Sequence, residues 1–317
     1  MSILLLGAKG QLGFELQRLL TPVFLEQLKQ CAALEHTPNI HCLSRQELDL
    51  SDLEAVSAAL QTLQPQFILN ASAYTAVDKA ETHPMEAMRI NHLVPEVLAR
   101  YASSAKAVLV HFSTDFVFDG LASKPYTETD PTAPLSVYGQ TKRAGEEAIT
   151  ASGCQSLIFR TGWLMGAHGQ NFLKTMLKLA RDKTQLKVVN DQLGAPTSAK
   201  WLASTSLSAL ITCMQQNPGG THSPWGLYHA SSEGTTSWHA YAKTAITLAE
   251  GLGFAQTLKP QDVLPIQSVD YPLPAKRPAY SVLSGEKLAQ TFRIHRPLWT
   301  EAVMDVLQEI KRLNLPL

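Results

Sequence analysis

The sequence predicts an α/β protein with a Rossmann-type, doubly wound parallel sheet and a smaller, partly interleaved C-terminal substrate domain. Two observations carry this prediction. Short, almost wholly apolar runs alternate with longer amphipathic segments through the first two-thirds of the 317 residues. That alternation is typical of parallel strands covered by helices on both faces. A glycine-rich turn also joins the first apolar run to the first amphipathic segment, at residues 7–13.

The elements follow one another in regular order. Apolar runs predict strands at 2–6, 40–43, 67–69, 107–112 and 157–159. Leucines at helical spacing, beginning with Leu12 and Leu16, predict a helix over 11–20. Further helices are expected at 53–63, which Ser51 or Asp52 would cap, and at 85–103 and 137–151.

The pattern loosens after about residue 165, where glycines and prolines cluster. Helical spacing nevertheless persists at 172–181, 201–214, 239–252 and 300–313. We therefore expect residues 1–165 to form the Rossmann domain, to whose sheet later segments can return. Residues 166–317 are expected to form mainly the second, substrate-binding domain.

Composition excludes several classes of protein. Apolar residues make up 45% and charged residues 17% of the chain, which is ordinary globular composition. Lys and Arg number 27 and Asp and Glu number 27, so no polybasic field indicates a nucleic-acid or anionic-membrane partner. The four cysteines show no C-x-x-C spacing and indicate neither a zinc site nor a disulfide framework. No apolar run approaches the roughly 20 residues of a membrane span, so we expect a cytoplasmic protein without a membrane partner.

The glycine turn predicts a dinucleotide site. The G-x-x-G-x-x-G run lies between a strand and a helix, where glycines let the backbone approach a pyrophosphate and the helix N-terminus presents free N–H groups. The alternative is a purely structural turn. The residues expected to bind the cofactor here are Gly7, Lys9, Gly10, Gln11, Leu12 and Gly13.

The end of the second strand favours NADPH as the cofactor, with NADH as the alternative. Ser44 stands where NAD-binding Rossmann units usually carry a carboxylate, and Arg45 follows it. A hydroxyl and a guanidinium can bind a 2′-phosphate that a carboxylate would repel. Arg45 could instead be a solvated loop residue. Asp49 either contacts the adenine or caps a turn.

An acid–base group is predicted at the start of the helix over 137–151. Tyr138 and Lys142 are four residues apart and share one helix face. A free phenol, with a pKa of about 10, is a weak acid–base at neutral pH. We expect the Lys142 cation, together with an oxidised nicotinamide, to lower the pKa of Tyr138. Thr114 ends the buried strand upstream, where open α/β sheets bind ligands, and its hydroxyl can position a substrate carbonyl. The alternative is a surface helix pair.

These motifs resemble those of the extended short-chain dehydrogenases/reductases. Longer runs, spread over almost the whole chain, are similar to the dTDP-4-dehydrorhamnose reductase family within that group. The runs are N-A-S-A-Y-T-A-V-D-K-A-E at 70–81, S-T-D-F-V-F-D-G at 113–120, Y-G-Q-T-K-R-A-G-E at 138–146, F-R-T-G-W at 159–163, N-D-Q-L-G-A-P-T at 190–197, G-L-Y-H at 226–229 and Arg277-Pro278.

The resemblance implies an oxidoreductase that reduces the 4-keto group of dTDP-4-dehydro-L-rhamnose with NADPH, in dTDP-rhamnose and cell-surface polysaccharide (lipopolysaccharide O-antigen) biosynthesis. It implies that Tyr138 donates the proton, Lys142 assists it and Thr114 aligns the ketone. Asn70, Ala71 and Ala73 would line the cofactor. The further residues implied for the nucleotide-sugar substrate, each of which has a structural alternative, are Asp115, Trp163, Asn171, Phe172 and Arg277.

The chain departs from the family pattern at two places. Phe116 replaces a tyrosine in the segment after Thr114, which removes a hydroxyl near the sugar. Some family members dimerise around Mg²⁺ held by glutamates. Glu15 matches the first of these, but Lys200 and Thr300 stand where the others are expected. One carboxylate beside a lysine is a poor magnesium site. We expect no metal and no Mg²⁺-bridged dimer, and a monomer or weak homodimer.

Besides the 4-keto reduction of another nucleotide sugar, two other functions remain open at this stage. An epimerase or dehydratase could use the same scaffold, although dehydratases of this type commonly carry an Asp-Glu pair where this chain has Asp115-Phe116. A non-catalytic regulatory relative could retain the fold alone. The intact set of Thr114, Tyr138 and Lys142 argues against that second alternative.

Overall fold

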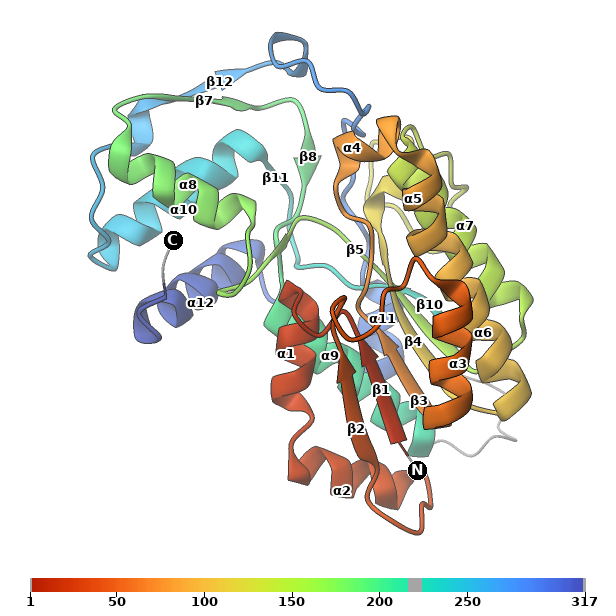
Figure 1. Cartoon of the computed structure of the whole chain (residues 1–317). Helices are drawn as coiled ribbons and strands as arrows, with labels where there is room; N and C mark the ends of the chain where they lie inside the picture. The colour runs from red at the N-terminus through yellow and green to blue at the C-terminus, as the bar shows by residue number, and fades with distance from the viewer. Residues whose placement is uncertain (1, 216–223, 316–317) are drawn as a thin grey trace.

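The computed structural model describes residues 2–215 and 224–315. Figure 1 shows two lobes, a larger one around a central sheet and a smaller one of helices and short strands. The six strands of the central sheet are β1 (Ser2–Leu6), β2 (Asn39–Leu43), β3 (Phe67–Asn70), β4 (Val108–Thr114), β5 (Ser156–Thr161) and β10 (Gly226–His229).

The central sheet has the order β2-β1-β3-β4-β5-β10, and every neighbouring pair is parallel. Leu6 is in register with Leu43 on one side and with Asn70 on the other, so the carboxyl ends of the strands meet at one edge. The strand order reverses between β1 and β3, which is where open α/β sheets bind ligands. The predicted doubly wound parallel sheet is confirmed.

Helices cover both faces of this sheet (Figure 1). Ile3 and Leu5 pack on one side and Leu4 and Leu6 on the other, which explains why the strand sequences are apolar throughout. The first face is covered by α1 (Gln11–Leu19), α2 (Pro22–Cys31), α9 (Ala199–Gln215) and α11 (Glu286–Phe292). On the other side lie α3 (Leu53–Leu63), α4 (Val77–Thr82), α5 (Pro84–Met88), α6 (Val94–Ala105) and α7 (Val137–Ala151).

The smaller lobe is built on three helices, α8 (Phe172–Asp182), α10 (Trp238–Gly251) and α12 (Trp299–Arg312). Its short strands pair as β6 (Leu164–Met165) with β9 (Thr197–Ser198), β7 (Leu186–Val189) with β12 (Val263–Ile266), and β8 (Leu193–Gly194) with β11 (Thr236–Ser237). The 3₁₀ turns are η2 (Asp115–Val117), η3 (Pro260–Asp262) and η4 (Ser268–Asp270). None of the helices in the described ranges is both long and apolar enough to cross a membrane.

Several segments differ from the sequence-based expectations. The helix expected at 85–103 is divided into α5, the π-helical turn η1 (Arg89–Leu93) and α6. Helices α2, α4 and α11 have no counterpart among the predicted elements. As the sequence analysis allowed, segments from beyond residue 165 return to the central lobe: α9 packs against α1, α11 covers the same face, and β10 pairs with β5.

Candidate active site

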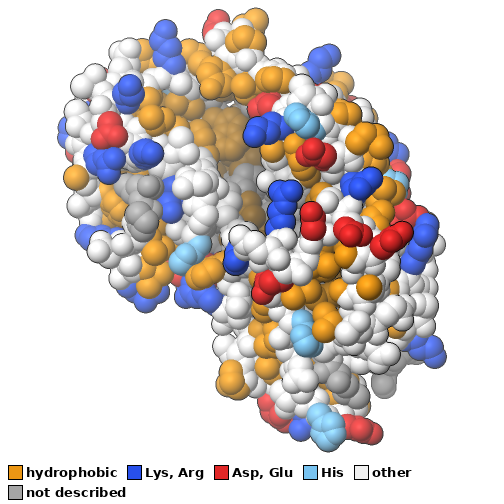
Figure 2. All heavy atoms as spheres, viewed as in Figure 1, with side chains coloured by type: hydrophobic (Ala, Val, Ile, Leu, Met, Phe, Trp, Pro, Cys, Tyr) orange, Lys and Arg blue, Asp and Glu red, His pale blue; other side chains and the backbone are white. Residues whose placement is uncertain are grey.

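Two adjoining cavities follow the carboxyl edge of the sheet, and Figure 2 shows the molecule hollowed between the lobes. The first, of about 580 Å³, lies against the ends of β1 and β2 and against α5. The second, of about 510 Å³, lies between the ends of β4 and β5 and the loop before α8. The two share Gly10, Ala71, Ser72 and Ala73, so together they form one elongated site.

The glycine turn lies where the cavities meet. Gly7 has a φ of +76°, and a Cβ there would lie 2.8 Å from the carbonyl carbon of Ala71. A Cβ on Gly13 would lie 2.1 Å from the Gly7 oxygen, so the turn and α1 pack too closely for a side chain. Helix α1 begins after Gly10 with no side-chain cap. Its first N–H groups are therefore free to bind an anion.

The residues after β2 line the first cavity as expected. Ser44 and Arg45 form part of its wall, and Arg45 takes part in no ion pair within the described ranges. The Ser44 N–H donates to the Glu47 carboxylate at 2.7 Å. Asp49 also lines the cavity and accepts hydrogen bonds from the N–H and the hydroxyl of Ser51, which lower its pKa. Lys9 donates to Gln46 at 2.5 Å and lines the second cavity.

Helix α7 brings Tyr138 and Lys142 to the second cavity. The Ser136 hydroxyl caps this helix by accepting from Gly139 N–H at 3.2 Å. The Lys142 ammonium nitrogen Nζ lies 2.6 Å from the Phe112 carbonyl oxygen, to which it donates. Burial lowers the pKa of Lys142 to about 8, against the opposing charge of Glu146.

The predicted lowering of the Tyr138 pKa is wrong for the protein on its own. Burial raises this pKa to about 12, because removing water from the phenolate outweighs the hydrogen bond with Thr114, and the charge of Asp115 adds to the rise. The phenol is therefore fully protonated at neutral pH.

Thr114 ends β4 at the wall of the second cavity. Its hydroxyl accepts from the Phe116 N–H at 3.2 Å and lies 3.1 Å from an Asp115 carboxylate oxygen. Asp115 is 2% exposed and lies behind this wall, where burial raises its pKa to about 6. A Cβ on Gly162 would lie 2.5 Å from the Asp115 carboxylate, so the backbone that follows β5 closes over that group. The Phe116 ring meets the Tyr138 ring edge-on, with centroids 5.7 Å apart.

Trp163 lines the second cavity and is also tightly packed. Its φ is +47°, in the left-handed region, and its indole stacks on Trp238 with centroids 3.5 Å apart. A Cβ on Gly194 would lie 2.5 Å from the indole. Strained backbone of this kind is concentrated at functional sites, and here it aims the indole across the border between the lobes.

The remaining three substrate candidates make contacts within the protein and line neither cavity. Asn171 caps α8 by accepting from the Lys174 N–H, and its amide donates to the Gln11 side chain at 2.8 Å. Phe172 packs on Trp238. Arg277 forms a two-pronged ion pair with Asp78 at 2.8 and 3.1 Å.

Other residues of the site were not among the sequence-based candidates. The hydroxyls of Ser113 and Thr161 are buried at the second cavity and have no hydrogen-bond partner in the described part of the chain. Their position at strand ends beside Thr114 is the signal that could have identified them. His111, Asn91 and Ser72 also hold neighbouring side chains, through hydrogen bonds that are buried or partly buried.

A second carboxylate, which the sequence analysis did not identify, lies near Glu15. Arg18 lies 3.3 Å from the Glu15 carboxylate and 2.8 Å from that of Glu309. Burial and the charge of Glu309 raise the pKa of Glu15, while Lys200 opposes them. No group of three or more metal-ligating side chains is found in the ranges that the structure describes.

Comparisons with known proteins agree with this geometry. The chain matches the family described as RmlD substrate binding domain over residues 1–312. It is 40% identical to a dTDP-4-dehydrorhamnose reductase from Burkholderia thailandensis over 303 residues, 96% of this chain and 97% of the other. The identity to the reductase of the same name from Escherichia coli K12 is also 40%, over 98% of each chain.

Solved structures give the same result. A dTDP-4-dehydrorhamnose reductase from Clostridium acetobutylicum superposes with a TM-score of 0.84 at 34% identity, over 98% of this chain and 100% of the other. The enzyme of that name from Bacillus anthracis, solved in complex with NADP, has a TM-score of 0.83 at 30% identity over the same shares. The chain therefore belongs to the dTDP-4-dehydrorhamnose reductase family of extended short-chain dehydrogenases/reductases.

Proposed function

We propose that this protein reduces the 4-keto group of dTDP-4-dehydro-L-rhamnose to the hydroxyl of dTDP-L-rhamnose, with NADPH as the reductant. The supporting observation is that one cavity brings Tyr138, Lys142 and Thr114 together beside the glycine turn. The relatives named above, at 40% identity over almost their full length, bear the name of this activity.

The site fits a dinucleotide. The turn at Gly7 excludes side chains, the first N–H groups of α1 are uncapped, and two joined cavities provide an elongated space. Gly10, Gln11 and Leu12 would hold the pyrophosphate, Ser44 and Arg45 the 2′-phosphate, and Lys142 the nicotinamide ribose. The other residues proposed to line the cofactor are Gly7, Lys9, Gly13, Asp49, Asn70, Ala71, Ala73 and Tyr138. When bound, NADPH supplies the hydride to C4 of the sugar.

The protonation state of Tyr138 suits a reduction. A ketone that accepts hydride becomes an alkoxide and needs a proton, so its partner must begin as a protonated acid. Burial holds the pKa of Tyr138 at about 12, which keeps the phenol in that state at neutral pH. In this proposal the Thr114 hydroxyl turns from Asp115 to the substrate carbonyl and aligns it with the phenol.

The two lobes divide the ligands between them in this proposal. Residues 1–165 with α9 and β10 bind the cofactor, and the lobe of α8, α10 and α12 binds the sugar nucleotide. Trp163 has the strongest support among the substrate residues because it lines the cavity. Asn171, Phe172 and Arg277 would have to exchange present partners to reach a ligand. Asp115 would act through Thr114.

We also propose a cytoplasmic setting and a monomer or weak homodimer. All four cysteines are free thiols, which suits a reducing compartment.

An assay of one substrate with two alternative cofactors tests the proposed function. We expect dTDP-4-dehydrorhamnose to cause loss of the absorbance of the reduced nicotinamide, faster with NADPH than with NADH run in parallel. Purified protein that retains tightly bound NAD⁺ and shows no net oxidation would instead indicate an epimerase. Intact nucleotide binding without turnover would indicate a regulatory relative.

Arg45→Ala is expected to weaken NADPH binding by about 10- to 100-fold, since a charge-assisted hydrogen bond contributes roughly 1.5–3 kcal/mol. NADH binding should change little, because its ribose lacks the phosphate. Titration of each cofactor against the variant measures both dissociation constants. Arg143→Ala, which removes an exposed guanidinium paired with Glu147, is the control. Equal losses for the two cofactors would contradict the assignment of Arg45.

A further inference from the structure

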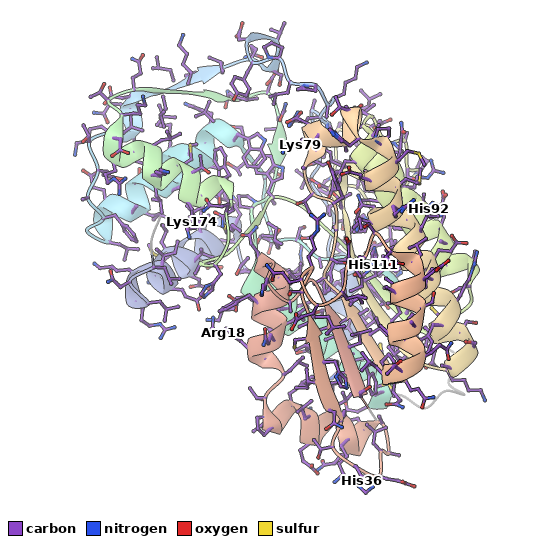
Figure 3. The ribbon with its side chains drawn as sticks, viewed as in Figure 1. Arg18, His36, Lys79, His92, His111 and Lys174 are labelled. Atoms are coloured by element: carbon purple, nitrogen blue, oxygen red, sulfur yellow. The ribbon has the colours of Figure 1, made fainter. Side chains whose placement is uncertain are left out.

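His111 lies in the middle of β4 and is completely buried, with 0% of its surface exposed. Figure 3 shows it among the strands of the central sheet, whereas His36 and His92 lie toward the periphery. Its Nδ1 lies 3.1 Å from the Asn70 amide nitrogen, and its Nε2 lies 3.3 Å from the Lys142 nitrogen Nζ. The ring therefore connects the end of β3 to the lysine of the active site.

Hydrogen bonds at Ser72 determine which way the Asn70 amide faces. The Asn70 oxygen lies 3.2 Å from the Ser72 backbone nitrogen and 2.5 Å from the Ser72 hydroxyl. A backbone N–H can only donate, so the atom facing it must be the amide oxygen. The NH₂ group of Asn70 is therefore the group that faces His111.

This orientation selects one tautomer of His111. Because the Asn70 NH₂ donates to Nδ1, that nitrogen must be unprotonated and the ring hydrogen must be on Nε2. The ring does not carry a second proton, since burial and the neighbouring Lys142 hold the pKa of His111 well below its usual range. A ring N–H thus points at the Lys142 nitrogen.

An ammonium and a neutral amine fit this environment differently. An ammonium has three donors and no acceptor, so the Nε2–H of His111 would face another donor. A neutral amine accepts from Nε2–H through its lone pair, donates one hydrogen to the Phe112 carbonyl at 2.6 Å and retains one hydrogen for the cavity. The surrounding hydrogen bonds are complete only for the neutral amine.

Other charged groups act on Lys142 from the elements around it. Glu146, one turn further along α7, favours the ammonium form of Lys142. Arg160 of β5 partly neutralises the Glu146 carboxylate in a buried ion pair. Asp115 of η2 acts on Tyr138. Glu81 of α4 accepts from the Val137 N–H, and η1 presents the uncharged Asn91 to Thr141. In the tautomer deduced above, His111 opposes the charge through its ring N–H, because Nε2 lies 3.3 Å from the Lys142 nitrogen.

We propose that Asn70 and His111 are positioning residues that control the protonation state of Lys142, by fixing an imidazole N–H against its amine. The inference rests on the proposed reductase function, in which Lys142 meets the cofactor. In this proposal Asn70, at the end of β3, affects the reaction through His111, whose ring touches neither the substrate nor the reacting atoms.

The tautomer is measured directly by ¹⁵N NMR of the full chain labelled at histidine, without substrate. The His111 resonances are those missing from the spectrum of His111→Phe. We expect a protonated Nε2 and an unprotonated Nδ1, unchanged between about pH 6 and 9 because the ring stays neutral. A protonated Nδ1 would overturn the proposal. This measurement is independent of turnover, so failure of the reductase assay would leave it interpretable.

A second experiment tests the effect on Lys142. In Asn70→Asp, the carboxylate accepts from Nδ1–H, which moves the ring hydrogen and frees Nε2 to accept from the ammonium. The ammonium supports the phenolate that Tyr138 leaves behind, so turnover falls as pH rises through the lysine pKa. We expect this alkaline limb, at saturating NADPH, to move up by about one pH unit.

The added negative charge is separated from the tautomer by repeating the substitution in a His111→Phe background. If the carboxylate acts through the imidazole, the shift of the alkaline limb largely disappears there. The same shift in both backgrounds would mean that charge alone acts on Lys142, and would overturn the proposal. His36→Gln, at an exposed histidine far from the site, is the matched control and should leave the limb unmoved.

Discussion

Tyr138→Phe is expected to lower kcat by about 10²- to 10⁴-fold, the usual contribution of a positioned acid. The phenol is protonated at neutral pH because burial raises its pKa to about 12, so phenylalanine removes the proton that the alkoxide needs. The ring remains, and so does its edge-on contact with Phe116. Single-turnover rates with saturating NADPH and dTDP-4-dehydrorhamnose measure the loss at the chemical step.

Cofactor binding separates a chemical defect from a structural one. Tyr138→Phe should bind NADPH within a few-fold of the unaltered protein, because the glycine turn and α1 are untouched. Tyr101→Phe is the matched control. The Tyr101 hydroxyl donates to the Pro65 carbonyl at 3.3 Å, just before β3, and Tyr101 lines neither ligand cavity. A nearly unchanged rate in Tyr138→Phe would remove this residue from the role of acid.

Glu146→Gln is expected to lower the free energy of unfolding by about 3–5 kcal/mol, the cost of leaving one member of a buried ion pair alone. Both Glu146 and Arg160 are buried, and the carboxylate accepts from the guanidinium at 2.6, 2.9 and 3.2 Å. The guanidinium also lies over the Phe118 ring. A neutral amide cannot balance the charge of Arg160, and the pair joins α7 to β5.

The neighbouring residue supplies the control. Glu147 pairs with Arg143, but its side chain is 61% exposed, so Glu147→Gln should cost at most about 1 kcal/mol. Urea unfolding of the two variants and the unaltered protein gives the comparison. A difference between the variants below about 1 kcal/mol would show that the buried pair contributes no more than a surface pair.

Local patterns account for the parts of this protein that were predictable. Strands β1, β3, β4 and β5 each contain a continuous apolar run. The glycine turn and the Tyr138–Lys142 pair are also local patterns, because each spans only a few residues. The return of α9 and β10 to the central lobe depends on partners far away in the sequence, α1 and β5 respectively, which periodicity cannot identify. The division of the helix at Asn91 depends on the close approach of Gly145, whose Cβ would lie 2.2 Å from the Asn91 oxygen.

The electrostatics were harder to predict than the positions. The charge of Lys142 suggested a lowered pKa for Tyr138, but burial has the larger effect on both groups. It raises the pKa of Tyr138 to about 12 and lowers that of Lys142 to about 8. Likewise, the sequence names Arg277 and Glu15 as charged candidates, yet it does not show that Asp78 and Glu309 lie beside them. The partner of a charged side chain is a property of the tertiary structure.

The hydrogen bond between Gln11 and Asn171 has a mechanical consequence. One end belongs to the opening turn of α1, beneath the pyrophosphate position, and the other caps α8 in the opposite lobe. If α1 moves when a dinucleotide binds, either this 2.8 Å hydrogen bond breaks or the N-terminal end of α8 moves together with α1. One hydrogen bond thereby links the lobe proposed to bind the sugar nucleotide to the turn proposed to bind the cofactor.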